Sequence, residues 1–233
     1  MGEPAQKRLV RKLDLELFLS KIKPHPSPEV NLEQYTISES VAATMLYLAA
    51  YTYGDIVGKK VLDLGSGTGR LSLGAAFLGA QSVVGVDIDK IAVKIAFGNS
   101  VREGLKANVE WVAGDIDSVA GKFDTVLQNP PFGVQKRGAD RRFLEKSLEA
   151  GYAVYSLHNH PSTEKRSAGR RKADIDGFVQ VNTSSFIRKF VEDCGGRVEA
   201  VYALPMVIPR MFSFHTKARH EIVVDLYVLR RAK

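Results

Sequence analysis

The chain has 233 residues, of which 45% are hydrophobic and 25% charged, and this composition excludes collagen-like and intrinsically disordered proteins. Its 33 Lys and Arg residues outnumber 26 Asp and Glu residues, and the resulting charge of +7 favours a polyanionic partner. The single cysteine excludes an internal disulfide and a multi-cysteine zinc cluster.

The first 58 residues are predicted to contain two helices separated by a proline-rich break. A helix over 7–23 is indicated by apolar residues at close to helical spacing: Leu9, Val10, Leu13, Leu17 and Ile22. Prolines 24, 26 and 28 end it, because each lacks a backbone donor. A second helix is expected over 38–53, which is too short to span a bilayer. Without a recognisable signal peptide, we expect a cytoplasmic protein that has no membrane partner.

From residue 59 onward, short β-rich runs alternate with helical ones. Buried strands are predicted over 60–64, 82–87, 109–113, 123–128 and 152–157. Helices are predicted over 69–78, 90–100 and 140–151, with a short helical turn within 115–121. This alternation predicts a Rossmann-like, doubly wound α/β fold, with a mostly parallel sheet and helices on both faces.

The last third of the chain has a different pattern. Asn182-Thr183-Ser184 is expected to cap a helix that ends at Gly195-Gly196. Strands over 198–204 and 221–229, joined by 205–220, are expected to close the sheet as an antiparallel hairpin. We therefore interpret 59–233 as the core and 1–58 as a helical cap within the same domain.

Three glycines mark the turn after the first strand, in the run Gly65-Ser66-Gly67-Thr68-Gly69. Glycine permits positive φ and lets a ligand approach the backbone, so a nucleotide-like ligand is expected here. Arg70 stands where the dinucleotide fingerprint has Gly or Ala, which disfavours NAD and FAD. Asp87, at the end of the second strand, suits the ribose hydroxyls of an adenosine.

Two further aspartates allow more than one role. Asp63 could bind a cationic amino group, and Asp115 could accept a hydrogen bond from an adenine amine. Either could instead cap a helix.

The fourth predicted strand runs into Asn129-Pro130-Pro131-Phe132, which we expect to be the catalytic segment. The prolines fix an extended loop with free carbonyl oxygens, Asn129 adds an amide oxygen, and Phe132 offers a face for stacking. Acceptors around a planar amine suit methyl transfer to nitrogen, because they favour the pyramidal nitrogen of the transition state.

These motifs resemble those of class I S-adenosylmethionine-dependent methyltransferases that act on amino nitrogens. Further motifs resemble the methyltransferase-like protein 5 family: Leu32-Glu33-Gln34-Tyr35-Thr36, Ala139-Asp140-Arg141, Phe143-Leu144, Val154-Tyr155-Ser156-Leu157-His158 and Phe214-His215-Thr216-Lys217. The resemblance implies methylation of adenine N6 in small-subunit ribosomal RNA, with S-adenosyl-L-homocysteine as the second product. It also implies a possible small zinc-containing activator at strand 109–113, which should be an edge of the sheet.

The resemblance assigns roles to individual residues. It places Gln34 and Thr36 over the cofactor, Gly65, Gly67 and Gly69 at its methionine part, Asp87 at its ribose, and Asp115 with Ile116 at its adenine. Ile88 is a further cofactor-binding residue. Asn129 and the Pro130 carbonyl would hold the target amine, and Phe132 would stack on the flipped base. Phe214, His215 and Lys217 would line the RNA side.

Two basic clusters, 136–142 and 164–172, are also consistent with RNA binding. The first contains Lys136, Arg137, Arg141 and Arg142. The second lies in an inserted basic loop at about 159–182, which departs from the family pattern and is either a lid over RNA or a surface loop.

The sequence is also consistent with other functions. The same acceptors suit N5-methylation of a glutamine in a translation factor, although those enzymes usually carry Tyr at the position of Phe132. A non-catalytic RNA-binding scaffold is a further alternative. Cytosine C5 methylation is disfavoured because the single thiol, Cys194, lies far along the chain. His158 and His160 lack carboxylate or cysteine partners at a supporting spacing, so we expect no metal site.

Overall fold

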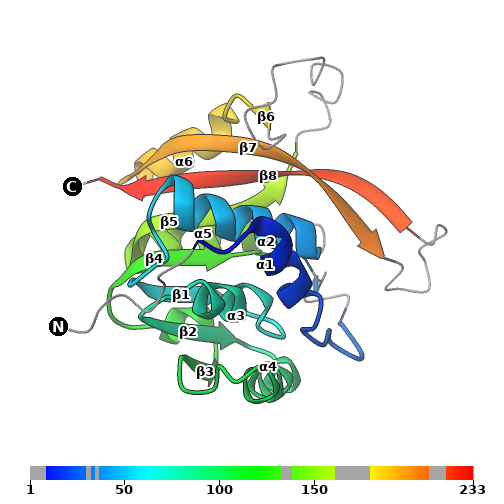
Figure 1. Ribbon diagram of the computed structural model, residues 1–233. Coiled ribbons are helices and arrows are strands. Elements are labelled where there is room, and N and C mark those ends of the chain that lie inside the picture. The colour runs from blue at the N-terminus through cyan, green and yellow to red at the C-terminus, as the bar shows by residue number, and fades with distance from the viewer. Residues whose placement is uncertain are drawn as a thin grey trace.

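A computed structural model gives the structure of the protein and describes residues 9–29, 33–34, 37–132, 138–160, 179–209 and 219–232. These residues form an eight-stranded sheet in the order β3-β2-β1-β4-β5-β8-β7-β6 (Figure 1). The five parallel strands are β1 (Lys60–Leu64), β2 (Ser82–Asp87), β3 (Val109–Ala113), β4 (Phe123–Gln128) and β5 (Gly151–Asn159). The antiparallel strands are β6 (Val179–Gln180), β7 (Gly196–Pro209) and β8 (Arg219–Arg231). The predicted fold class is therefore confirmed.

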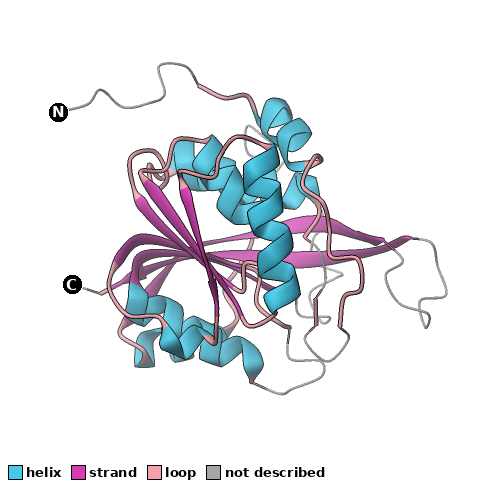
Figure 2. Cartoon of the chain, turned by 90° about the horizontal axis from the view of Figure 1, so that it is seen from below, coloured by secondary structure: helices cyan, strands magenta, loops and turns pink. Residues whose placement is uncertain are grey.

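Helices cover both faces of the sheet (Figure 2). One face carries α1 (Lys12–Leu19), α2 (Glu39–Tyr47) with its π-helical extension η2 (Leu48–Thr52), α3 (Arg70–Phe77) and α4 (Lys90–Arg102). The other face carries α5 (Ala139–Ala150) and α6 (Ser185–Asp193). The short 3-10 helix η3 (Ile116–Ser118) follows β3. Each helical layer packs on its own apolar core, so the sheet is buried between two hydrophobic layers.

The N-terminal helix buries a different face from the one that the apolar spacing suggested. Leu15, Phe18 and Leu19 are buried against α2 and α3, whereas Leu13 and Leu17 are 59% and 57% exposed. Phe18 stacks on Phe77 of α3 with ring centroids 4.2 Å apart. The helix therefore has two apolar stripes, and contact with α3 determines which one is buried.

The C-terminal strands extend beyond their predicted bounds. β7 continues to Pro209 and β8 begins at Arg219, so the connection is shorter than 205–220. The two strands pair along nearly their whole length, with a register shift between Val198 and Ala200. Pairing between the two strands satisfies their backbone hydrogen-bonding groups, so the strands extend further than their sequence pattern predicts. The short strand β6, which pairs with β7, was not predicted.

Two other local predictions need correction. β3 was predicted to be a buried strand at the edge of the sheet; its edge position is confirmed, but only Val109 among its five residues is buried. Ser184 stands at the N-cap of α6 as expected, yet its side chain makes no capping hydrogen bond. Within the described ranges, none of the helices has the length and apolar character required to cross a membrane.

Candidate active site

The carboxyl ends of the parallel strands surround a cavity of about 380 Å³, a volume within the range of small-molecule sites. It is lined by most of the residues expected to hold the cofactor: Gln34, Asp63, Gly65, Gly67, Asp87, Ile88, Asp115, Ile116 and Asn129. Pro131 also lines it, whereas Gly69, Pro130 and Phe132 are described but lie outside the lining. The site therefore joins the glycine turn to the catalytic segment.

The glycine turn has the strained geometry that its sequence predicts. Gly65, Gly67 and Gly69 have φ values of +70°, +53° and +90°. A Cβ on Gly69 would lie 2.4 Å from the Trp111 ring, and one on Gly65 would lie 3.1 Å from the Phe143 ring. The backbone conformation disfavours a side chain at all three glycines, and a neighbouring ring adds a clash at Gly69 and a tight contact at Gly65. The turn consequently presents bare backbone to the cavity.

Asp87 links the glycine turn to the end of β2. Its Oδ2 accepts a hydrogen bond from Gly67 N at 2.7 Å, and its Oδ1 accepts one from Asp89 N at 2.9 Å. Burial raises the pKa of Asp87 above its ordinary value, and these backbone donors act in the opposite direction. The carboxylate is thus fixed at the cavity wall.

Asp63, on β1, is a buried carboxylate with one occupied oxygen. Its Oδ2 accepts hydrogen bonds from Ser72 N at 2.9 Å and Ser72 Oγ at 2.5 Å. Among the described residues, none donates a hydrogen bond to the buried Oδ1. Burial raises the pKa of Asp63 to about 7. A buried acceptor without a donor, in the cavity wall, fits a cationic ligand group such as the amine of a methionine moiety.

His25 lines the cavity although the sequence gave no reason to place it there. Its Nε2 lies 3.0 Å from Asp89 Oδ2, the same oxygen that accepts from Gln34 Nε2 at 2.8 Å. Ser27 N donates to His25 Nδ1 at 3.1 Å. Burial acts to raise the pKa of Asp89, but the hydrogen bonds from Gln34 and the backbone bring it below the ordinary value. His25, which lies between two prolines, and Gln34 therefore contact the same carboxylate, that of Asp89.

Arg70 also has a role that its sequence position did not reveal. Its side chain is buried, Nη1 donates to Ile37 O, and Nη2 lies 3.0 Å from Glu39 Oε1. Burial lowers the pKa of Arg70, and Glu39 acts in the opposite direction. The residue that departs from the dinucleotide fingerprint therefore holds the segment after Gln34 beside the glycine turn. Thr36, predicted to lie there too, is outside the described residues.

The catalytic segment leaves β4 at a buried polar cluster. Gln128 Nε2 donates to Ser156 Oγ at 2.9 Å, and Ser156 Oγ lies 2.8 Å from His158 Nε2. Next along the chain, Asn129 lines the cavity, Pro130 is buried and Phe132 packs against the core beside α1–α3. These contacts fix the point at which the segment enters the site.

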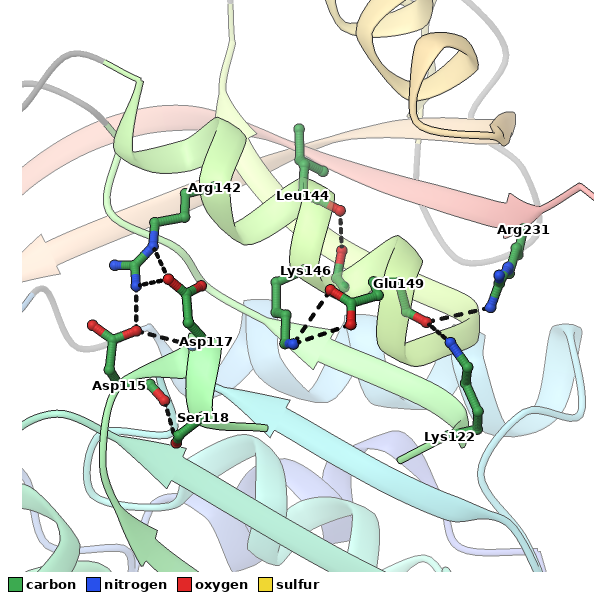
Figure 3. A network of polar contacts seen from close by, with 10 residues as sticks. Asp115, Asp117, Ser118, Lys122, Arg142, Leu144, Lys146, Glu149 and Arg231 are labelled. Atoms are coloured by element: carbon green, nitrogen blue, oxygen red, sulfur yellow. Dashed lines mark hydrogen bonds and ion pairs between the residues drawn. The ribbon is translucent and has the colours of Figure 1, made fainter. Parts of the chain in front are cut away.

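Asp115 combines the two roles that the sequence left open. It lines the cavity, and its Oδ1 accepts from Asp117 N at 2.9 Å, which caps η3. The same oxygen accepts from Arg142, which also contacts Asp117 (Figure 3). Arg142, counted in a basic cluster from the sequence, is thus paired with two aspartates.

Most of the expected RNA-binding residues are outside the described residues: Lys136, Arg137, Phe214, His215 and Lys217, together with most of the inserted loop. Arg141 is described, and its guanidinium lies 4.8 Å from the centre of the Phe186 ring on α6. It is not part of the cavity lining.

His158, near the end of β5, and His160, just after the strand, both have protein partners. His158 packs edge-on against Tyr227 with centroids 5.3 Å apart, and burial lowers its pKa to about 4. His160 Nδ1 lies 2.7 Å from Asp225 Oδ1. In the part of the chain that the structure describes, no group of three or more His, Cys, Asp or Glu residues could hold a metal ion.

Comparisons with known proteins agree with this geometry. The family model described as ribosomal protein L11 methyltransferase (PrmA) matches residues 42–130. The rRNA N(6)-adenosine-methyltransferase METTL5 of Danio rerio is 37% identical over 218 residues, which cover 91% of this chain and 95% of the relative. An uncharacterized protein of Methanocaldococcus jannaschii is 36% identical over 231 residues, or 94% of each chain. A solved structure from Pyrococcus horikoshii superposes with a TM-score of 0.80 at 37% identity, covering 97% of this chain and 100% of that one.

The METTL5 relatives match this chain over nearly their whole length and therefore across both the glycine turn and the catalytic segment. The chain belongs to the METTL5 family of rRNA N6-adenosine methyltransferases.

Proposed function

We propose that this protein transfers a methyl group from S-adenosyl-L-methionine to the exocyclic N6 of an adenine in small-subunit ribosomal RNA. The observation that carries the proposal is the single cavity that joins the glycine turn and Asp87 to Asn129 and Pro131. Relatives named rRNA N6-adenosine methyltransferases support the choice of adenine N6 and of ribosomal RNA. S-adenosyl-L-homocysteine is the second product.

The described residues fit this cofactor. Bare backbone at Gly65 and Gly67 leaves room for the methionine part, and the buried Oδ1 of Asp63, which has no donor among the described residues, matches its ammonium group. We assign the ribose to Asp87 and the adenine to Ile88, Asp115 and Ile116. Gln34 and Thr36 would close over the cofactor, with Gly69 shaping the turn beneath it.

The catalytic segment would act on the target amine through acceptors. When bound, the cofactor supplies an electrophilic methyl group on sulfur. Asn129 Oδ1 and the Pro130 carbonyl would accept hydrogen bonds from the two N–H groups, which draws the nitrogen lone pair out of conjugation with the ring. Pro131 keeps the loop extended, and Phe132 would stack on the flipped base. The nitrogen becomes acidic once alkylated, so a strong general base is not needed.

RNA would be bound by basic and aromatic side chains. We assign this role to Lys136, Arg137, Arg141, Phe214, His215 and Lys217. The net charge of +7 supports it, because cations that neutralise phosphates supply most of the affinity of such interfaces. We also propose a cytoplasmic location. We further propose a single domain in which residues 1–58 cap the 59–233 core, and the packing of α1 and α2 on α3 supports this organisation.

A small zinc-containing activator is a further proposed partner, at β3. The strand is an edge of the sheet, and exposed edges invite strand addition. Apolar side chains are exposed beside it: Val112 on the strand at 42%, and Phe97 and Val101 on α4 at 46% and 50%. An edge strand with adjacent apolar surface is what strand addition with side-chain burial requires.

The substrate is tested by supplying methyl-labelled cofactor together with purified small-subunit ribosomal RNA or a translation release factor. We expect label in RNA, recovered as N6-methyladenosine. Label in the release factor and none in RNA would instead support glutamine methylation. Label in neither, with RNA still bound, would support the non-catalytic scaffold.

A further inference from the structure

Arg142 is a basic residue of α5 that contacts Asp115 in the wall of the cavity. It lines the cavity, and its guanidinium reaches the segment that follows β3 (Figure 3). Nη2 lies 2.5 Å from Asp117 Oδ2, Nε donates to the same oxygen at 3.2 Å, and Nη2 also donates to Asp115 Oδ1. One guanidinium therefore holds both aspartates.

The orientation of Asp115 is consequently set by two elements. From η3, Asp117 N donates to Asp115 Oδ1 at 2.9 Å, and from α5, Arg142 donates to the same oxygen. The hydrogen bonds that Arg142 donates to Asp117 and Asp115 raise the pKa of its guanidinium, so it stays charged. Its charge offsets the repulsion between two neighbouring carboxylates, which without it would separate.

We propose that Arg142 is a positioning residue for adenine recognition, which holds the Asp115 carboxylate where it accepts a hydrogen bond from the adenine amine of the cofactor. This inference rests on the proposed function, which places the adenine beside Asp115. A carboxylate fixed before binding loses less rotamer freedom when the ligand arrives, so the preference for an amine is built into the unliganded protein.

The neighbouring Arg141 provides a matched control. It is on the same helix turn and carries the same charge, but its guanidinium lies over Phe186 and not at the cavity. Removing either arginine changes the net charge equally, so a difference between the two variants reports position and not overall charge.

The test is calorimetric titration with S-adenosyl-L-homocysteine and with S-inosyl-L-homocysteine, in which a carbonyl oxygen replaces the adenine amine. The unaltered protein should prefer the adenine compound, because Asp115 repels an acceptor. Arg142→Ala should reduce this preference by about three- to tenfold, the scale of a half-exposed ion pair. Arg142→Lys, which keeps the charge but not the fork of donors, should reduce it less. Arg141→Ala should leave it unchanged.

The outcomes separate this inference from the function on which it rests. An unchanged preference in Arg142→Ala, or equal weakening of both compounds, would overturn the positioning role. A loss of RNA affinity equal to that of Arg141→Ala, with cofactor affinity intact, would assign Arg142 to the RNA surface. If the unaltered protein binds neither compound, the proposed function fails and this inference with it. Arg142 has a 45% exposed side chain, and thermal unfolding of each variant verifies that the fold is kept.

Discussion

Asn129 is the residue on which the proposed chemistry most depends. It directly follows a strand whose last residue, Gln128, is held by Ser156, so its amide enters the cavity from a fixed point. An acceptor that strengthens its hydrogen bond as the nitrogen becomes pyramidal lowers the barrier more than it lowers the ground state.

Replacing Asn129 by Ala should therefore reduce kcat by about 10²-fold or more, the effect of removing one preorganised hydrogen-bonding group from a transition state. RNA affinity should stay within about threefold, because phosphate contacts elsewhere dominate it. Single-turnover methylation and a filter-binding assay measure the two quantities. Unchanged turnover would contradict the mechanism, and a parallel loss of RNA affinity would indicate a binding role instead.

His25 should contribute to cofactor affinity through Asp89. Loss of its imidazole removes one of the two side chains that contact this carboxylate, the other being Gln34. We expect His25→Ala to weaken S-adenosylmethionine binding about three- to tenfold, the scale of one polar contact in the cavity wall, without changing kcat.

The control for His25 is Ser27→Ala, because that side chain is exposed and its backbone N–H, which donates to His25, is kept. Equilibrium dialysis with labelled cofactor compares the variants. Equal affinity in all three proteins would show that His25 does not support the site.

At the residue scale, sequence reasoning found groups with strong local signals and missed those defined by distant contacts. Gly65, Gly67 and Asp87 were predicted to lie together, and they do line one cavity. His25 and Arg70 were missed because their partners, Asp89 and the Ile37 carbonyl, are far from them in sequence. The prolines on either side of His25 do not reveal that the chain folds back to bring His25 next to Asp89.

At the element scale, the strands from 60 to 128 have the bounds that the sequence predicts. Gly, Asp or Asn residues mark most of their ends, so the signals are local. Local signals did not predict which of the two apolar stripes of α1 is buried. They also did not predict the lengths of β7 and β8, which depend on the pairing of these strands with each other. A sequence pattern predicts the bounds of a helix or strand well only when the residues that end it lie within or next to it.

The edge strand β3 leads to a prediction about partners. Val112→Lys places a charge on the exposed part of this strand and should weaken binding of the proposed zinc-containing activator at least about tenfold, since desolvating a lysine there is costly. Leu13→Lys, on a similarly exposed apolar residue of α1, should have no effect. Binding of the purified activator is measured by calorimetry. Equal affinity of both variants would remove β3 as the docking site.

At the scale of the whole molecule, buried ionisable groups connect stability to pH. His158 has a pKa of about 4 in the fold against an ordinary value of 6.5. The unfolded chain therefore binds a proton first as the pH falls, and stability is lost between about pH 6.5 and pH 4. Asp63, whose pKa is raised to about 7, acts in the opposite direction, because the folded chain keeps its proton over the same range.

The His158 contribution is isolated by comparing the protein with His158→Gln, since Asp63 is common to both. At pH 8 the variant should be less stable, and this difference should shrink by up to about 3 kcal/mol by pH 4, because the variant has no imidazole to protonate. Urea unfolding at several pH values measures the difference. A constant difference would show that His158 titrates normally.

Methyl transfer to adenine N6 in ribosomal RNA can be measured by mass spectrometry of nucleosides. Small-subunit RNA lacking the modification is incubated with S-adenosylmethionine and either the protein or Asn129→Ala, and then digested to nucleosides. We expect about one N6-methyladenosine per RNA molecule with the active protein and almost none with the variant. Methylation of another nucleoside, or equal N6-methyladenosine with both proteins, would contradict it.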